Sequence, residues 1–259
     1  MVLAVNAENT YIALGGFTES GLRFCAHIAT APFRTADQYA CDLLSMLTLY
    51  HVSEEPIEGA VLCSVVPSIT SVLTEALRRI SGHEPMNISS GVRTGLNIKI
   101  ENPRQLGSDL VCLAVEAAAT LPMPCLIVAA DTATTFTALN ASGTMVGSAI
   151  APGLLIGLAA LRTHAAQLPS IRPEAPEHGV MGCNTTDSMR SGVLFGHACM
   201  IDGMIQRFSE ALGGDITVAL TGAYSELLAP HLRTQTYRYP DLALHGLYRI
   251  WKKNKKRKS

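Results

Sequence analysis

The sequence predicts a two-domain α/β protein with a cleft between its domains. The chain has 259 residues, 48% of them apolar, which is enough for two domains of about 120 residues with substantial cores. Strand-like and helix-like segments alternate along it. The two halves also open with the same succession of strands and turns, and such an internal repeat indicates two similar domains.

The first half opens with an apolar strand, a tight polar loop, a second strand, a turn and a third strand. The polar loop is Asn6–Thr10, and the turn lies near Glu19–Gly21. A helix is predicted over Thr35–Tyr50, because Thr35 is a favourable cap and the apolar residues after it follow helical spacing. A strand over Ala60–Val66 and a helix over Ser68–Ile80 follow, since Pro67 separates them.

The second half repeats this opening. Its polar loop contains Asp131–Thr135, and its turn is Asn140–Gly143. The remaining predicted elements are the helix Asp109–Leu121 before this opening, the helices Leu154–His164 and Thr186–Leu212, the strand Ile216–Leu220 and a closing helix. We therefore predict domains over residues 1–121 and 122–259, with the two polar loops facing each other. Backbone N–H groups and hydroxyls in such loops can hold phosphates, although paired hairpins can also be plain architecture.

Charge and composition exclude several classes of protein. Six of the last eight residues are basic, and without them 14 basic residues stand against 21 acidic ones, so the body is a poor nucleic-acid binder. The basic tail is expected to be a solvated end rather than a binding arm. No apolar run is long enough to span a membrane, and the N-terminus lacks the pattern of a signal peptide. Seven scattered cysteines are expected to be mostly buried free thiols, so we expect a cytoplasmic protein.

A series of short motifs covers nearly the whole chain. They are Asn6–Thr10, Arg34–Tyr39, Ser64–Pro67, Thr94–Leu96, Asn102–Pro103 with Gly107–Asp109, Thr132–Thr135, Ala151–Leu154, Asn184–Thr185 with Gly192, Thr221–Gly222 and Leu242–Leu247. In this order they resemble the type III pantothenate kinases of the actin and sugar-kinase superfamily. The resemblance implies duplicated ribonuclease H-like domains with an interdomain cleft.

The resemblance also implies an activity, cofactors and a site. The expected reaction is ATP-dependent phosphorylation of pantothenate in coenzyme A biosynthesis, with Mg²⁺ and a monovalent cation, K⁺ or NH₄⁺. The family works as a two-fold dimer with substrate sites at the interface. The resemblance assigns Asp109 as catalytic base, Asn9, Gly107 and Thr185 to pantothenate, and Asn6, Thr10, Thr132, Thr134, Thr221 and Gly222 to nucleotide and phosphate.

The sequence departs from the family pattern at its phosphate loops. Asn6 and Ala129 replace the two aspartates, and Glu8 and Asp131 replace glycines. Mg²⁺ prefers anionic oxygens, and carboxylates in place of glycine repel a triphosphate unless a metal intervenes. Glu8 and Asp131 are therefore also candidate metal ligands. Leu110 replaces an arginine that would pair with the pantothenate carboxylate.

Several residues have an alternative, purely structural interpretation. Asp109 also suits the first turn of a helix, and Thr185 also suits a helix cap. The threonines at 132 and 134 also suit a β-strand. Asp187 and His197 are expected to be a solvated acid and a histidine on a helix face. An apolar stripe on the long helix, which is either an interface or the cover of its own sheet, comprises Met189, Val193, Met200, Ile201 and Met204.

The segment around Thr185 keeps the family pattern, whereas the phosphate loops do not. We therefore expect a pantothenate kinase subunit, in a homo- or heterodimer, that completes the site of an intact homologue. The alternative is a catalytically inactive ligand-sensing or regulatory protein of the same fold. A third class is a regulatory or nucleic-acid-associated protein that uses the basic tail. Salt-sensitive DNA binding that is lost when residues 252–259 are deleted would favour it.

Overall fold

The chain folds into two compact units in a computed structural model that describes residues 1–89, 91–165 and 167–255. Unit 1 comprises Met1–Leu96, Glu101–Ala119 and the chain from Asp241 onward, and unit 2 comprises Asn97–Ile100 and Thr120–Pro240. The sequence analysis grouped the closing helix with residues 122–259. In the structure this helix packs on the sheet of unit 1. The last four residues of the chain, 256–259, which are part of the basic tail, lie outside the described residues.

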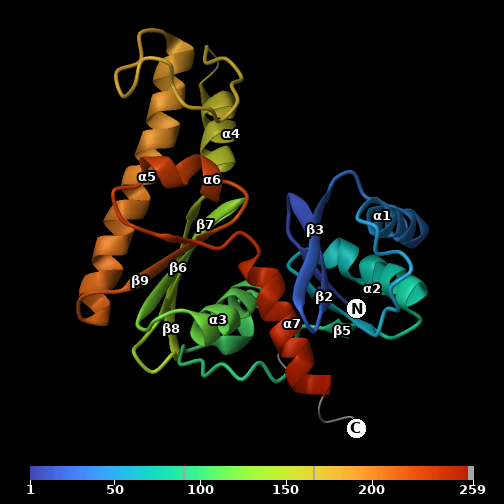
Figure 1. The fold of residues 1–259 in the computed structure, drawn as a ribbon. Coiled ribbons are helices and arrows are strands. Elements are labelled where there is room, and N and C mark those ends of the chain that lie inside the picture. Colours follow the sequence, from blue (N-terminus) through green and yellow to red (C-terminus); the bar gives the residue numbers. More distant parts are fainter. Residues whose placement is uncertain (90, 166, 256–259) are drawn as a thin grey trace. The chain divides into compact units, whose positions relative to one another are not determined.

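Unit 1 contains a five-stranded sheet in the order β3-β2-β1-β4-β5 (Figure 1). Its strands are β1 Val2–Ala7, β2 Tyr11–Thr18, β3 Gly21–Ala29, β4 Gly59–Ser64 and β5 Met86–Asn87. The first three strands form antiparallel hairpins, and β1 runs parallel to β4. The polar loop Glu8–Thr10 thus joins two paired strands, as the sequence predicts.

Unit 2 repeats this topology in the order β10-β9-β6-β7-β8. Its strands are β6 Cys125–Ala130, β7 Ala133–Leu139, β8 Met145–Pro152, β9 Thr217–Thr221 and β10 Tyr237–Arg238. Here β6 is antiparallel to β7 and parallel to β9. Each unit therefore has a central strand that leads into a polar hairpin loop, and the predicted duplication is confirmed.

The helices lie close to their predicted places. Unit 1 has α1 Ala36–Leu49, α2 Pro67–Ser81, the 3₁₀ turn η1 Pro103–Gln105, α3 Ser108–Thr120 and α7 Leu242–Lys255; unit 2 has α4 Leu154–His164, α5 Thr185–Leu212, α6 Ser225–Leu228 and η2 Ala229–His231. Boundaries differ from the prediction by one or two residues, as is usual for helix ends. Among the described residues no helix is both long and apolar enough to cross a membrane.

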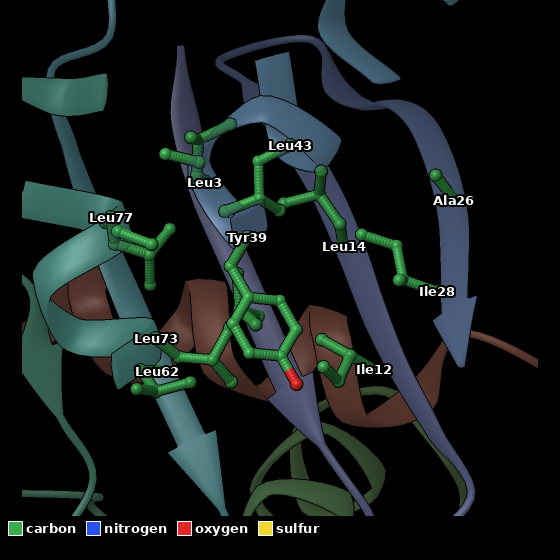
Figure 2. Packing of buried hydrophobic residues seen from close by; sticks show 14 of the residues in the cluster. Leu3, Ile12, Leu14, Ala26, Ile28, Tyr39, Leu43, Leu62, Leu73 and Leu77 are labelled. Atoms are coloured by element: carbon green, nitrogen blue, oxygen red, sulfur yellow. The ribbon is translucent and has the colours of Figure 1, made fainter. Parts of the chain in front are cut away.

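The core of unit 1 explains why β1 is buried along its whole length. Leu3 and Val5 pack with residues of β2, α1 and α2 on one face of the sheet, where Tyr39 and Leu43 are fully buried (Figure 2). Val2 lies on the other face, near Trp251 of α7. Because both faces are covered, a polar residue on β1 is buried too, and Asn6 is only 3% exposed.

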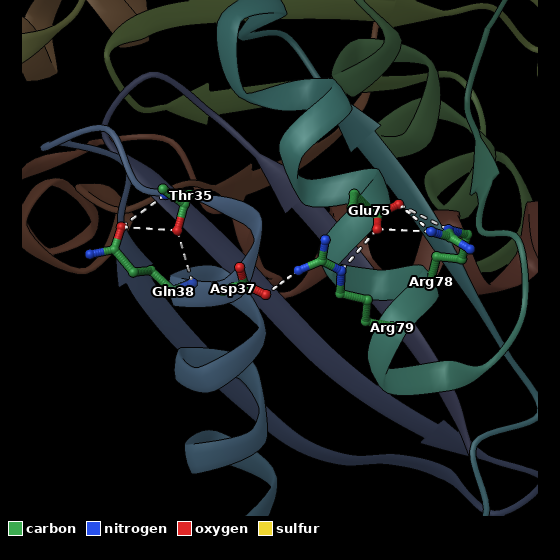
Figure 3. A network of polar contacts seen from close by, with 6 residues as sticks. All are labelled: Thr35, Asp37, Gln38, Glu75, Arg78 and Arg79. Atoms are coloured by element: carbon green, nitrogen blue, oxygen red, sulfur yellow. Dashed lines mark hydrogen bonds and ion pairs between the residues drawn. The ribbon is translucent and has the colours of Figure 1, made fainter.

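Surface polar contacts fix the start of α1 and link it to α2 (Figure 3). The Thr35 hydroxyl accepts from the Gln38 backbone N–H at 3.3 Å, and the Thr35 N–H donates to Gln38 Oε1 at 2.9 Å. This reciprocal capping box confirms the predicted cap. Arg79 pairs with Asp37 of α1 and with Glu75 of its own helix. Since these ion pairs are exposed, they orient the two helices more than they stabilise them.

The core of unit 2 divides the predicted apolar stripe of α5. Ile201 is fully buried and Met204 packs beside it, so both cover the sheet of their own unit. Val193 and Met200 also pack against this core, and together with Met189 they line a groove beside α4. All seven cysteines are free thiols, as expected. Three of them are exposed, Cys41, Cys183 and Cys199, so the expectation that most are buried is confirmed only in part.

Candidate functional site

The first polar loop is held by main-chain hydrogen bonds. The Glu8 N–H donates to the Tyr11 carbonyl at 2.9 Å, which closes the hairpin. The Thr30 hydroxyl donates to the Glu8 carbonyl at 2.6 Å, and the Thr30 N–H donates to the Thr10 carbonyl at 3.0 Å. The loop is therefore fixed on both sides, and the side chain of Asn9 at its tip is exposed.

Asn6 and Glu8 bring two oxygen donors to this loop. Asn6 Nδ2 donates to Glu8 Oε1 at 2.7 Å, so the amide and the carboxylate are adjacent. Asn6 Oδ1 is buried and has no hydrogen-bond partner among the residues that the structure describes. A buried amide oxygen without a partner costs free energy, and it is the kind of atom that a bound metal or water satisfies.

Asp109 lies at the same edge of unit 1. Asn6 is the register partner of Cys63 in the parallel pair β1–β4, and the Cys63 thiol donates to the Ser108 hydroxyl at 3.1 Å. Asp109 follows Ser108 in the first turn of α3, where its carboxylate packs against Gly107. Thus the loop after β1 and the start of α3 both lie at the end of the parallel pair β1–β4.

Burial sets the protonation behaviour of Asp109. It raises the pKa of the Asp109 carboxyl above its usual value, and hydrogen bonds from the N–H groups of Leu110 and of Asp109 itself offset part of this effect. A carboxylate with a raised pKa is a better proton acceptor once it is ionised. Leu110 is buried in α3 and offers no group that could bind a carboxylate.

The second polar loop contacts the turn after β9. Asp131 Oδ1 accepts a hydrogen bond from the Ala223 backbone N–H at 2.7 Å. Gly222 has φ +96°, and a Cβ there would lie 2.6 Å from both the Ala130 carbonyl oxygen and Asp131 Oδ2. Only glycine therefore fits at position 222, because the conformation is left-handed and the space is filled. The Thr221 hydroxyl donates to the Pro240 carbonyl at 3.3 Å.

The threonines of the second loop have different surroundings. The Thr132 carbonyl accepts from the Gly153 N–H at 3.1 Å, which places the start of α4 directly beside the loop. Thr134 is fully buried, and a hydrogen bond of 2.8 Å joins its hydroxyl to His197 Nε2 on α5. Burial lowers the pKa of His197, so this ring is neutral near pH 7. Its link to β7 is a role that the sequence interpretation missed, since the two residues are 63 positions apart.

The start of α5 is fixed by Asn184 and Asp187. Asn184, not Thr185, is the cap, and its side chain accepts from the Asp187 N–H at 2.9 Å. Asp187 is buried rather than solvated, and it accepts from the N–H groups of Glu177 and His178 and from His178 Nδ1. Burial alone would raise the pKa of Asp187, but these hydrogen bonds hold it below its usual value. Expecting a solvated acid was wrong, because the loop before α5 folds back onto it.

Thr185 lies on an apolar groove that is lined by residues of α4 and α5. The groove has a volume of about 600 Å³. Its wall includes the apolar residues Leu154, Leu161, Met189, Val193 and Met200, the glycines Gly157, Gly192 and Gly196, and the polar residues Thr185, Ser188 and His197. A Cβ at any of these three glycines would meet no atom of the described part of the chain within 4 Å. The glycines therefore leave the helix faces open.

The two candidate metal ligands differ in how well they suit Mg²⁺. Among the described residues no three His, Cys, Asp or Glu side chains form a metal cluster. Glu8 and the unpartnered Asn6 oxygen are hard donors, and Mg²⁺ is usually held by one or two such groups plus substrate phosphates. Both oxygens of Asp131 lie instead against the turn at Gly222 and Ala223.

Two units with one strand order, each with a polar loop after its central strand, define the fold of the actin and sugar-kinase superfamily. Solved structures agree. A 2-dehydro-3-deoxygalactonokinase-type protein from Sinorhizobium meliloti has a TM-score of 0.58 at 14% identity and covers 98% of this chain and 99% of its own. The activator of 2-hydroxyisocaproyl-CoA dehydratase from Clostridium difficile, solved with bound ADPNP, has a TM-score of 0.54 at 11% identity, with 99% and 97% covered.

Sequence similarity narrows this class to one family. Residues 2–207 match the profile of type III pantothenate kinase. The type III pantothenate kinase of Moorella thermoacetica is 35% identical over 98% of this chain and 100% of its own length, and that of Exiguobacterium sibiricum is equally similar over the same shares. This chain belongs to the type III pantothenate kinase family.

Proposed function

We propose that this chain is a pantothenate kinase subunit that transfers the γ-phosphoryl group of ATP to pantothenate, and that it completes the active site of an intact homologue. The observation that carries the proposal is a contrast within the chain. Thr185 lines the groove at the start of α5, where the Asn184 cap and the buried Asp187 fix the helix end. The phosphate loops, by comparison, have lost the carboxylates expected at Asn6 and Ala129.

In this chain's own active site Asp109 would act as general base. Its carboxylate would take the proton from the pantothenate hydroxyl, whose oxygen bonds to the γ-phosphorus while the bond to the bridging oxygen of ADP breaks. Glu8 and Asn6 would hold Mg²⁺, which neutralises charge on the phosphates when it is bound, and the reaction would also use a monovalent cation. With one carboxylate at this loop and Leu110 in place of arginine, we expect ATP–Mg²⁺ to bind poorly and turnover to be slow.

The α4–α5 groove would be the surface that receives the partner. Its wall is apolar, and nearby Val180 and Met181 are 70% and 80% exposed. Large apolar side chains that lie together and exposed to water usually form part of a surface that binds a partner. A homologous chain docked here would bring its pantothenate within reach of the Thr185 hydroxyl.

The test is the pantothenate kinase activity of the reconstituted pair, with substitutions made in this chain alone. Thr185→Val keeps the shape and removes the hydroxyl, so KM for pantothenate should rise by the equivalent of about 1–3 kcal/mol. Asn6→Ala, in the already altered loop, should change the pair's activity little. A silent Thr185→Val together with an inactivating Asn6→Ala would show that this chain's own cleft is the working one.

Ligand binding without turnover in every pairing would favour the alternative, an inactive sensor of the same fold. The absence of carboxylates at 6 and 129 supports that alternative. Calorimetry with pantothenate, run beside the kinase assay on the same preparation, separates the two functions.

A further inference from the structure

Position 131 holds an aspartate where the family pattern has glycine, and its carboxylate contacts a segment of unit 2 that is distant in the sequence. It links the loop after β6 to the turn after β9, 92 residues away in the sequence, through the hydrogen bond from the Ala223 N–H. Both ends of this contact lie in unit 2. The contact therefore depends on the fold of that unit alone.

The turn that Asp131 contacts is itself well ordered by the main chain. The Tyr224 N–H donates to the Ala130 carbonyl at 3.0 Å, and the Ser225 N–H donates to the Gly222 carbonyl at 3.0 Å. The Tyr224 and Ser225 N–H groups thus donate to main-chain carbonyls, whereas the Ala223 N–H donates to the anionic Asp131 oxygen. A main-chain N–H in a glycine-containing turn is a typical phosphate donor, because no side chain keeps the anion away.

We propose that the Asp131 carboxylate occupies the position of a nucleotide phosphate oxygen on the Gly222–Ala223 turn and so acts as a built-in competitor for nucleotide. A carboxylate resembles a pair of phosphate oxygens in charge and in hydrogen-bond acceptance. A nucleotide would have to break the Asp131–Ala223 hydrogen bond and also approach a like charge. The inference rests on the proposed function only in placing a nucleotide at this edge of unit 2.

Two substitutions separate occupancy from charge. Asp131→Gly removes both the side chain and its charge, whereas Asp131→Asn keeps an oxygen that can accept from Ala223 and removes the charge alone. Glu226→Gln is the matched control, because Glu226 is an exposed acid on the same segment that pairs with Arg238 and not with the turn.

The experiment is titration of the full chain with ADP by calorimetry, with and without Mg²⁺ and without pantothenate. We expect Asp131→Gly to bind ADP at least about tenfold more tightly than the unaltered chain, equivalent to about 1.4 kcal/mol. Asp131→Asn should gain less, and Glu226→Gln nothing. Amide hydrogen exchange gives a second readout: Ala223 should exchange faster in Asp131→Gly, and ADP should slow it again.

Two results would overturn the proposal. One is an Asp131→Gly variant that melts near the temperature of the unaltered chain and yet binds ADP no better. The other is weaker ADP binding in both the Asp131→Gly and Asp131→Asn variants, which would make Asp131 a ligand of nucleotide or metal instead. If Asp131→Gly does not fold, the Asn variant still tests the charge. Because pantothenate takes no part, a failure here is distinguishable from a failure of the kinase proposal.

Discussion

Gly246 is the point where the backbones of α7 and α3 touch in unit 1. A Cβ at this position would overlap the carbonyl oxygen of Cys112 and would lie 2.7 Å from its carbonyl carbon and 3.2 Å from its Cα. These are main-chain atoms of a helix, so they cannot rotate away as a side chain would. Gly246→Ala should therefore push the two helices apart.

The magnitude follows from two opposing terms. Overpacking of a well-packed core costs about 1–3 kcal/mol, and replacing a helical glycine by alanine gains about 0.5–1 kcal/mol. The difference is a net destabilisation of about 0–2.5 kcal/mol. We expect the upper half of this range, because main-chain atoms cannot rotate away. The matched control is Gly203→Ala in α5, where the new Cβ would meet nothing within 4 Å, so that only the gain of about 0.5–1 kcal/mol remains.

The single tryptophan makes the assay simple. Trp251 lies on α7, five positions after Gly246, and is 8% exposed, so its fluorescence reports on the unfolding of unit 1. In urea, Gly246→Ala should lower the midpoint of this signal. Gly203→Ala, in unit 2, should leave it unchanged and raise the midpoint of the circular-dichroism signal instead. A Gly246→Ala protein with an unshifted fluorescence midpoint would show that α3 and α7 are not in backbone contact.

Two further predictions concern α3. Burial raises the folded-state pKa of Asp109, so its stabilising contribution is full below the unfolded pKa, about 3.9, and is lost as the pH rises through the folded pKa. Asp109→Asn should therefore keep or raise the urea midpoint at pH 7, and a lower midpoint would contradict this argument. The same variant should lower the slow kcat of the homogeneous chain by about 10²–10⁴. Arg249 Nε donates to buried Glu116 at 2.7 Å, so Arg249→Met should cost up to about 3 kcal/mol in urea unfolding, less if water reaches the half-exposed site. The double variant Glu116→Leu with Arg249→Met should recover most of that loss, and no recovery would refute the pairing argument.

Much of the fold could be predicted because local signals agree with it. Thr35 and Gln38 form the capping box that begins α1, and Pro67 separates β4 from α2 as expected. The two hairpin openings share a pattern of apolar strands and polar loops, and both have the same strand order in the structure. These features depend on neighbours in the sequence, which is why the sequence shows them.

Contacts between distant segments could not be predicted in the same way. The return of α7 to unit 1 depends on Trp251 packing near Gly59, and the role of His197 depends on Thr134. The contact of Asp131 with Ala223 likewise joins two loops that no local pattern connects. Asn6 and Thr221 lie near the ends of interior strands of their sheets, whereas Thr185 lies at the start of α5. Their roles in catalysis stay predictions.

The packing of α7 has a consequence for the order in which the two units fold during synthesis. Unit 1 contains β1, which leaves the ribosome before the other strands of both units, yet it is finished by residues that are synthesised after the whole of unit 2. Until Leu242–Lys255 is available, one apolar face of β1 and β4 has no cover from α7. Unit 2, built almost entirely from the continuous stretch Thr120–Pro240, can form during synthesis. The domain that starts first is thus the one that folds to completion last.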